Sequence, residues 1–265
     1  MQKLTTILLS LALMAGCANL EKQGMHPGSH GKLPGYLVSE QLPDSVALIP
    51  APPASGSTAF ALDEEISRSS IPLRDTPRWE LAILDADLSF PAAADSFSCA
   101  LNTRLSEHET PHLFRLLRRT LSDVSSAISR PKKFYNRLRP FMRNGEPVCT
   151  PDYERSLRKS GSYPSGHTAA GWAWALILSE VAPGRADEVL VRGRALGQSR
   201  VVCNVHWQSD VDEGRTVAAA VVARLHADPA FRADLELARS ELATLNSKGL
   251  KPARDCKEEA EALAH

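Results

Sequence analysis

The sequence predicts an all-α domain, and three observations favour this class. From about residue 57 onward, apolar residues recur every three or four positions, which is the spacing of one helix face. No segment shows the apolar–polar alternation of a half-buried strand, and no internal repeat is visible. Of the 265 residues, 43% are apolar, which suffices for a core. We therefore expect one compact helical bundle domain of about 200 residues with further segments at its ends.

The predicted helices follow one another along the chain. A long helix begins with Thr110 as N-cap and Pro111 in its first turn, and its leucines form one stripe toward the core. Residues 168–181 are apolar on all sides, which predicts a buried central helix ended by Pro183 and Gly184. The other predicted helices cover residues 57–68, 76–87, 186–202, 206–225 and 229–245. An extended arm is expected at 42–53 and an irregular stretch at 144–160.

Both ends of the chain carry signals of their own. Residues 1–17 read as a targeting segment, with Lys3, a short apolar core and the ending Ala-Gly-Cys. This ending resembles the lipobox of bacterial lipoproteins, so we expect export with Cys17 lipidated; ordinary signal cleavage nearby is the alternative. Residues 18–36 are expected to form a flexible tether and residues 37–245 the domain. A charged, frayed tail is expected at 246–265.

One stretch combines a cation, an imidazole and a carboxylate. In SRVVCNVHWQSD, Arg200 precedes His206 by six residues and Asp210 follows it by four. If residues 206–210 are helical, His206 and Asp210 share a face. The carboxylate can then accept the Nδ1 proton and leave Nε2 free as a base or nucleophile. A surface His–Asp pair beside an unrelated arginine is the alternative for this stretch taken alone.

Two further segments add groups of matching chemistry. In KKFYNRLRP, Lys132 and Arg139 are seven residues apart, and two helical turns would place them on one face. In SYPSGHT, Ser165 and Gly166 are expected to start a helix, where backbone N–H groups attract an anion, and His167 follows them. Three cations, a helix N-terminus, two histidines and an aspartate are a set suited to a multiply charged oxyanion.

The three segments together resemble the signature of the acid phosphatase and type 2 phosphatidic acid phosphatase superfamily. That signature is Lys-x6-Arg-Pro, Pro-Ser-Gly-His and Ser-Arg-x5-His-x3-Asp, and every position is present in order. A wider resemblance, from about Leu37 to about Ala238, is to the soluble bacterial class A non-specific acid phosphatases. It implies a helical bundle of the acid phosphatase and vanadium haloperoxidase type.

Charge and resemblance lead to the same expected mechanism. The groups expected to neutralise a bound phosphate are cations or N–H and O–H donors: Lys132, Arg139, Ser165, Gly166 and Arg200. His206, held by Asp210, would attack phosphorus, and the resemblance implies a phosphohistidine at this residue. His167 would protonate the leaving alcohol and then activate water, which needs a protonated His167 and favours mildly acidic pH. We expect hydrolysis of phosphate monoesters without metal or cofactor, with phosphotransfer or nucleotide diphosphohydrolase activity as side reactions.

Four cysteines remain besides Cys17, and in an exported chain they allow two disulfides in three possible pairings. Cys149 with Cys203 is an attractive pair because both flank the predicted site, whereas buried free thiols are the alternative. No Cys-x-x-Cys or Cys/His spacing suggests a zinc site, and no metal ligands are predicted.

The same residues are compatible with two other functions. Vanadium haloperoxidases share the site design, with vanadate in place of phosphate on the histidine that matches His206. Those chains are much longer and have additional helices. A non-catalytic envelope lipoprotein that only binds phosphate is the alternative from another class, but binding alone needs neither His167 nor His206.

Partners and location follow from composition and from the N-terminal segment. The 31 basic and 31 acidic residues cancel, which argues against a nucleic-acid partner. We expect small phosphate esters as substrates and membrane contact only through an N-terminal lipid. The expected location is the periplasm or cell envelope, including attachment to the outer membrane. Related enzymes form homo-oligomers, and the sequence leaves the oligomeric state of this chain open. The sequence does not indicate which ester is the physiological substrate.

Overall fold

The computed structural model describes residues 33–264, and this part of the chain contains helices and connecting segments but no strand. The predicted all-α class is confirmed. The predictions for residues 1–17, for Cys17 and for most of the tether lie outside the described residues. None of the described helices has the length and apolar character needed to cross a membrane.

The described helices vary widely in length. In chain order they are α1 (Ser45–Leu48), α2 (Thr58–Ser70), α3 (Pro77–Leu84), α4 (Ala92–Asp95), α5 (Ser98–Leu101), α6 (Pro111–Tyr135), α7 (Phe141–Asn144), α8 (Pro151–Leu157), α9 (Gly166–Val181), α10 (Ala186–Val202), α11 (Gln208–Leu225), α12 (Pro229–Ser247) and α13 (Cys256–Leu263). Short 3₁₀ turns cover Ser39–Gln41, Ile71–Leu73 and Pro183–Arg185.

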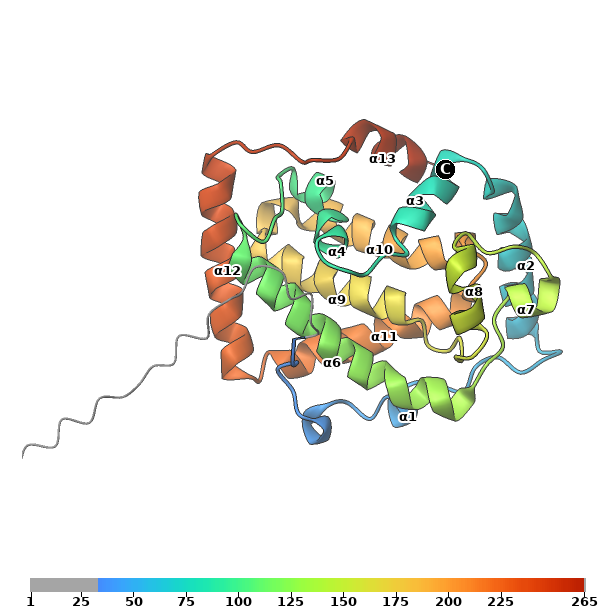
Figure 1. Ribbon diagram of the computed structural model, residues 1–265. Helices are drawn as coiled ribbons and strands as arrows, with labels where there is room; N and C mark the ends of the chain where they lie inside the picture. Colours follow the sequence, from blue (N-terminus) through green and yellow to red (C-terminus); the bar gives the residue numbers. More distant parts are fainter. Residues whose placement is uncertain (1–32, 265) are drawn as a thin grey trace, which may run out of the picture. The chain divides into compact units, whose positions relative to one another are not determined.

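Helix α9 is the centre of the domain, as its apolar sequence predicts. It lies between α6, α10 and α11 (Figure 1), and Trp174 on it is fully buried. The indole N–H of Trp174 donates to the carbonyl of Leu117 on α6 at 3.0 Å, so this polar group is satisfied inside the core. A Cβ on Gly193 of α10 would lie 2.3 Å from the Cβ of Ala175 on α9, so the glycine permits the close contact of the two helices.

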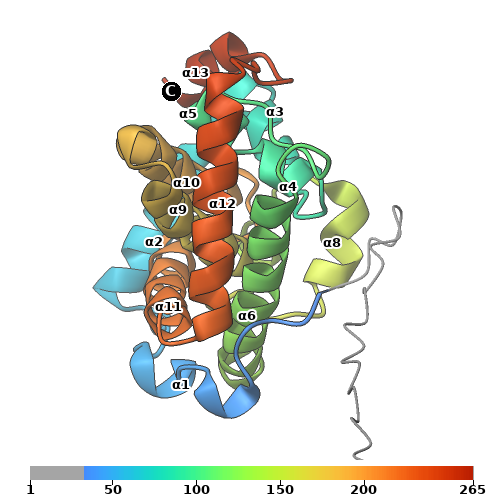
Figure 2. The same ribbon diagram turned by 90° about the vertical axis from the view of Figure 1, so that its left-hand side faces the viewer.

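The chain directions of these helices place four helix ends together. Helices α6 and α10 end, and α9 and α11 begin, at the same end of the bundle (Figure 1). Helix α12 runs across their other ends (Figures 1 and 2). Since Lys132 is near the end of α6 and Arg200 near the end of α10, the predicted site residues gather at the end away from α12.

Short helices occur where the sequence predicted irregular chain. Residues 42–53 contain α1, whose N-cap Asp44 accepts the N–H groups of Val46 and Ala47 at 3.1 and 3.4 Å. Residues 144–160 contain α8, with Pro151 in its first turn. Helices of four and seven residues are too short for apolar periodicity to reveal them.

The first described residues are fastened to the bundle. The backbone N–H groups of Tyr36 and Leu37 both donate to the Asp123 carboxylate on α6, at 3.0 and 2.9 Å. The Tyr36 hydroxyl donates to Asp234 of α12 at 2.8 Å, and the Arg119 guanidinium lies 3.6 Å from the centre of the Tyr36 ring. The domain therefore begins slightly earlier than its predicted start at residue 37.

The frayed C-terminal tail predicted at residues 246–265 is wrong for much of its length. Residues 256–263 form α13, which packs against α3. Asp255 caps this helix, and the Cys99–Cys256 disulfide fastens its first residue to α5. Buried Glu259 forms ion pairs with Arg254 at 2.8 Å and with Arg192 on α10 at 3.4 Å. The sequence did not reveal this arrangement because both the disulfide and the Arg192 ion pair depend on tertiary contacts.

We expect that replacing both Cys99 and Cys256 with serine lowers the free energy of unfolding by about 2–5 kcal/mol, because the disulfide closes a loop between residues 157 apart in sequence. Thermal unfolding of the double variant beside the unmodified protein measures the loss. Limited proteolysis should also cut the connection between α12 and α13 faster. Equal melting temperatures would show that the link contributes nothing to stability.

Candidate active site

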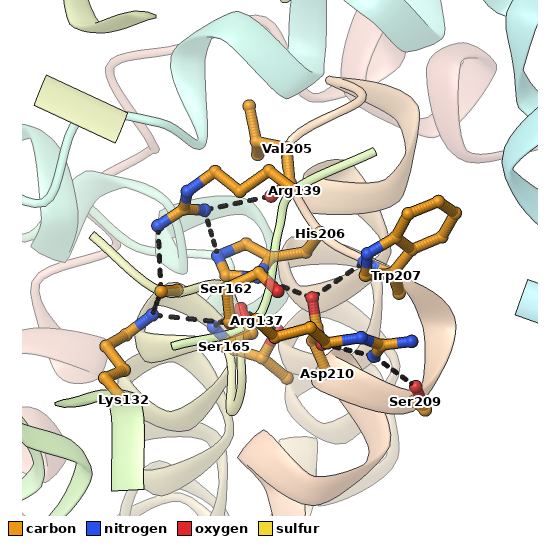
Figure 3. A network of polar contacts seen from close by, with 12 residues as sticks. Lys132, Arg137, Arg139, Ser162, Ser165, Val205, His206, Trp207, Ser209 and Asp210 are labelled. Carbon is orange, nitrogen blue, oxygen red and sulfur yellow. Dashed lines mark hydrogen bonds and ion pairs between the residues drawn. The ribbon is translucent and has the colours of Figure 1, made fainter. Parts of the chain in front are cut away.

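The predicted site residues lie together at the end of the bundle described above. Figure 3 shows the side chains of Lys132, Arg139 and His206 pointing toward one another, with Asp210 on the other side of the imidazole. Lys132 comes from the last turn of α6, Ser165 and Gly166 from the start of α9, Arg200 from the last turn of α10, and Asp210 from the first turn of α11.

His206 is held from both ring nitrogens. Its Nδ1 lies 3.2 Å from Oδ2 of Asp210, and its Nε2 lies 3.2 Å from the Nη1 of Arg139. A carboxylate can only accept and a guanidinium can only donate. The neighbours therefore favour the tautomer with the proton on Nδ1 and a lone pair on Nε2.

The reason why His206 meets Asp210 differs from the sequence prediction. His206 lies outside the helix, because α11 begins at Gln208 with Trp207 as its N-cap. Asp210 is the third residue of α11, and its Oδ2 reaches back to accept the Trp207 N–H at 2.9 Å. The carboxylate thus satisfies a free N–H at the helix start and holds the imidazole with the same oxygen.

Arg139 also reaches the site by a different route from the one predicted. Helix α6 ends at Tyr135, and Asn136 adopts a left-handed conformation with φ 39°, so Arg139 lies in the loop rather than two turns along the helix. Its guanidinium donates to the carbonyls of Leu157 at 3.0 Å and Val205 at 2.9 Å. Burial lowers the pKa of Arg139 to about 10, and the group remains a cation.

Lys132 is directed at the chain that precedes α9. Its Nζ donates to the carbonyl of Gly161 at 2.9 Å and lies 3.4 Å from that of Ser162. Burial, and after it the charges of Arg139 and Arg200, lower the pKa of Lys132 to about 7, although Asp210 acts in the opposite direction. The ammonium is therefore fully charged only below neutral pH.

Arg200 lacks a full set of partners in the part of the chain that the structure describes. Its Nε is buried and makes no hydrogen bond, and its Nη1 lies 3.8 Å from the Cys203 sulfur, which is a weak acceptor. A buried donor without an acceptor costs free energy, which a bound anion would recover. Burial and the charge of Arg139 lower the pKa of Arg200 to about 10.

The start of α9 is built as predicted from Pro-Ser-Gly-His. Ser165 is the N-cap, and its hydroxyl accepts the Thr168 N–H at 3.3 Å. Gly166 and His167 occupy the first turn, where a helix leaves backbone N–H groups without helical partners. The Ser165 N–H donates to the carbonyl of Asp210 at 2.8 Å, which joins the start of α9 to the start of α11.

His167 is oriented by the chain after α3. Its Nε2 lies 3.0 Å from the carbonyl of Ala86, which can only accept, so the neutral ring carries its proton on Nε2. Burial lowers the pKa of His167 to about 3, assisted by Arg200, Lys132 and Arg139. The imidazole is therefore neutral at mildly acidic pH, in contrast to the protonated state that the sequence-based mechanism requires.

The neighbouring Asp85 keeps the Ala86 carbonyl in place. Its carboxylate pairs with Arg192 and accepts the Ser199 hydroxyl at 2.6 Å, all in the buried interior. Ser199, the first residue of the Ser-Arg segment, therefore does not face the phosphate cations but anchors α10 to the chain after α3.

Like charges dominate the electrostatics of the site. The pKa of His206 lies well below its usual value of 6.5 because of burial and then the charges of Arg139, Lys132 and Arg200. Burial also raises the pKa of Asp210, while Arg137 and the Trp207 N–H act in the opposite direction. Such a collection of buried cations around a neutral imidazole is suited to binding an oxyanion next to a nucleophile.

Cys149 and Cys203 form a disulfide, with their Cα atoms 4.7 Å apart. Cys203 directly follows α10, so this link joins the chain before α8 to the helix that carries Arg200.

Sequence reasoning missed two residues of the site, Arg137 and Asp63. Arg137 lies inside the KKFYNRLRP segment and pairs with Asp210, with 2.7 Å between its Nη1 and Oδ1. Asp63 on α2 pairs with Arg137 from the other side at 2.7 Å. In the sequence, Asp63 is separated from Phe60, Ser67 and Ser70 by three, four and seven residues, so helical spacing places all four on one face of α2. That face is buried.

Comparison with known proteins gives a consistent result. A sequence profile described as PAP2 superfamily matches residues 116–233. A non-specific acid phosphatase of Providencia stuartii is 44% identical over 211 residues, covering 79% of this chain and 85% of that protein. An acid phosphatase of Zymomonas mobilis is 43% identical over 75% of each chain. A non-specific acid phosphatase of Salmonella typhimurium is 41% identical over 78% of this chain and 84% of its own.

Among solved structures, a transmembrane PAP2 type phosphatidylglycerolphosphate phosphatase from Bacillus subtilis aligns with 68% of this chain and 87% of its own. The TM-score is 0.46 at 18% sequence identity, a likeness too slight to bear on the site.

We expect that Gly161→Ala lowers the free energy of unfolding by about 1–3 kcal/mol and weakens binding of inorganic phosphate. A Cβ at this position would lie 2.5 Å from the backbone carbonyl oxygen of Lys132, so the loop must move and take with it the carbonyl that holds the ammonium. Thermal unfolding and phosphate titration by calorimetry measure the two effects.

Gly184→Ala is the matched control, because a Cβ there meets no atom within 4 Å. Unchanged stability and phosphate affinity in both variants would contradict the packing described around Lys132.

Proposed function

This chain belongs to the PAP2 superfamily as an acid phosphatase, and on that premise we propose that it hydrolyses phosphate monoesters through a phosphohistidine formed on His206. The observation that carries the proposal is the geometry of this imidazole. Its Nδ1 faces Asp210 and its Nε2 faces the guanidinium of Arg139, so the nucleophilic lone pair is directed at the group of buried cations.

The first step is binding of the phosphate group. Its oxygens would take the place of the backbone carbonyls as acceptors for Lys132 and Arg139, and one would satisfy the Nε of Arg200. The first-turn N–H groups of α9 add donors at a helix N-terminus. Neutralising the oxygens removes the repulsion that protects a phosphate monoester from nucleophiles.

The second step is phosphoryl transfer to the enzyme. The Nε2 lone pair of His206 forms a bond to phosphorus while the bond from phosphorus to the ester oxygen breaks. The ester oxygen leaves with its electron pair and receives a proton from His167. Asp210 stabilises the positive charge that develops on the His206 ring, because its Oδ2 accepts the Nδ1 proton.

The third step returns the enzyme to its starting state. His167, now neutral, takes a proton from water as the water oxygen attacks phosphorus. The bond between phosphorus and Nε2 breaks, and inorganic phosphate leaves. An alcohol in place of water would give phosphotransfer, and a diphosphate in place of the monoester would present the same terminal group. We include both as side activities of the proposed site.

The neutral state of His167 implies that binding of the anion and uptake of a proton are coupled. Its low pKa results from burial and from three nearby cations. A bound dianion offsets those cations, so the pKa rises toward the working pH. Since Nε2 already donates to Ala86, the incoming proton belongs on Nδ1. Substrate binding would thus charge the general acid.

We also propose that the protein is exported to the periplasm or cell envelope, with Cys17 as a lipid anchor to the outer membrane. The apolar segment that ends at Cys17 supports export. Two disulfides within the described residues, Cys99–Cys256 and Cys149–Cys203, support an oxidising compartment. Small phosphate esters are the proposed partners, and a homo-oligomer is the proposed assembly.

We expect hydrolysis of p-nitrophenyl phosphate with EDTA present, highest on the acidic side of pH 7, and its loss by at least about a thousandfold in His206→Ala. The physical reason is that removal of the nucleophile leaves only the binding contribution of the cations. A pH series from 4 to 8 on both proteins is the measurement. Full activity in the variant would place the nucleophile elsewhere, and loss of wild-type activity in EDTA would contradict a metal-independent mechanism.

We expect that binding of sulfate, a tetrahedral dianion that does not itself titrate near neutral pH, takes up close to one proton at pH 5. The sign follows from the pKa of His167, which is about 3 before binding and rises when the anion arrives. Uptake by His167 should fade as the pH rises above its pKa in the complex, while near neutral pH Lys132, whose pKa is about 7, adds uptake of its own. Calorimetry in buffers of different ionisation enthalpy measures the proton count. Zero uptake, or undiminished uptake in His167→Asn, would exclude His167 as the acceptor.

A further inference from the structure

A row of three buried charged side chains runs behind the nucleophile, and only its last member, Asp210, has a part in the chemistry above. It consists of Asp63 on α2, Arg137 in the loop after α6, and Asp210 at the start of α11. Their side chains are 3%, 8% and 0% exposed. Burying two carboxylates and one guanidinium costs free energy unless each is paired and hydrogen-bonded. These three residues therefore keep their charges away from water by pairing with one another.

The hydrogen bonds of the Asp210 carboxylate are divided between its two oxygens. Oδ2 accepts from the Trp207 N–H at 2.9 Å and lies 3.2 Å from Nδ1 of His206. Oδ1 accepts from the Nη1 of Arg137 at 2.7 Å. Because Arg137 holds Oδ1 on the far side, the carboxylate cannot turn without breaking an ion pair, and Oδ2 stays directed at the imidazole (Figure 3).

Arg137 is itself fixed from its other nitrogen and from its faces. Its Nη2 donates to Oδ2 of Asp63 at 2.7 Å, and its Nη1 also donates to the Ser209 hydroxyl at 2.7 Å. The rings of Phe60, Tyr163 and Trp207 surround the guanidinium at 5.8, 6.0 and 5.4 Å from its central carbon. Two hydrogen-bonding arms and an aromatic enclosure leave the guanidinium one orientation.

Asp63 joins this arrangement to the helix that carries Asp210. Its Oδ1 accepts the Ser209 N–H at 2.9 Å, and its Oδ2 accepts the Ser209 hydroxyl at 2.6 Å. Ser209 is the second residue of α11, so a carboxylate from α2 serves the first turn of another helix. Movement of α2 would therefore disturb both Arg137 and the start of α11.

We propose that Arg137 and Asp63 are positioning residues for the nucleophile, which hold Asp210 so that it keeps His206 in the tautomer with a free Nε2. The proposal rests on the proposed role of His206. Neither residue touches the groups assigned to phosphate binding, so both act through Asp210 and leave anion affinity to the cations. Arg137 supplies a planar guanidinium with several N–H donors and a positive charge, and Asp63 keeps that guanidinium oriented toward Asp210.

The test compares Arg137→Gln, Arg137→Lys and Asp63→Asn with Arg119→Gln as the matched control. Arg119 also pairs with a carboxylate, Asp234, at 3.5 Å, but on the α6 and α12 face that holds Tyr36. Three quantities are measured: kcat for p-nitrophenyl phosphate, the Kd for sulfate, and the nitrogen-15 shifts of His206 in histidine-labelled protein, assigned with His206→Ala. Melting temperatures establish that each variant is folded.

We expect Arg137→Gln to lower kcat by about a hundredfold, as misplacement of a catalytic group does, while the sulfate Kd changes less than about threefold. The nitrogen-15 spectrum should change from a single Nδ1–H tautomer to a mixture. Arg137→Lys, which keeps the charge without the fork, should regain part of kcat. Asp63→Asn should also lower kcat, but by a smaller factor. Combining it with Arg137→Gln should cause little further loss of kcat. Arg119→Gln should lose stability only.

A folded Arg137→Gln with unmodified kcat and an unmodified His206 spectrum would overturn the proposal. An equal loss of kcat and sulfate affinity, matched by Arg119→Gln, would also overturn it, since that indicates general destabilisation. If Arg137→Gln does not fold, Asp63→Asn decides by the same criteria. The spectrum remains decisive even if His206 proves not to be phosphorylated, so failure of this proposal is distinguishable from failure of the proposed function.

Discussion

Three cations, Lys132, Arg139 and Arg200, share one buried space, and their mutual repulsion is the constraint that shapes the surroundings of the site. Arg139 depresses the pKa of both Lys132 and Arg200, and Arg200 depresses that of Lys132. Asp210 offsets part of this repulsion without a direct ion pair, whereas the hydrogen bonds of Lys132 and Arg139 to protein oxygens go mainly to backbone carbonyls. Carbonyl groups hold the cations in place without cancelling their charge, which leaves an incoming phosphate as the best available counter-charge.

The carboxylate that the site does contain is kept on the far side of the imidazole. Asp210 reaches His206 only through Nδ1, and its other oxygen is held by Arg137. A carboxylate beside the three cations would compete with phosphate and repel it. Separation of Asp210 from the cations by the ring of His206 therefore allows both a positive binding space and an oriented nucleophile.

The bundle supplies this arrangement through its helix ends. Lys132 and Arg200 lie in the last turns of α6 and α10, where a cation is favoured, and the first turn of α9 supplies N–H groups that favour an anion. Three links keep the loops there in place. The Cys149–Cys203 disulfide lies beside α10, Asp85 accepts the Ser199 hydroxyl next to the Ala86 carbonyl that holds His167, and the Ser165 N–H donates to the Asp210 carbonyl. Although Arg139 and His206 lie outside the helices, these links join the chain around them to the helices of the bundle.

Much of this could be predicted from the sequence, and the remainder has identifiable physical causes. The bounds of α10 at residues 186–202 were predicted correctly, and the Ser165 cap of α9 has a local signature. The route of Arg139 was predicted wrongly because Asn136 turns left-handed, which a spacing of seven residues does not reveal. Asp63 and α13 depend on partners distant in sequence, Arg137 and Cys99, so a single sequence offers only a weak signal for them.

The central claim is that a covalent bond forms between phosphorus and Nε2 of His206, and mapping the phosphorylated residue tests it most directly. The protein would be mixed with substrate at mildly acidic pH and quenched within milliseconds into alkali, which preserves phosphohistidine. Digestion and mass spectrometry then locate the phosphate. The account predicts phosphate on the peptide that contains His206 and none on the peptide that contains His167. Phosphate on His167, or rapid turnover with no labelled histidine at any time, would contradict it.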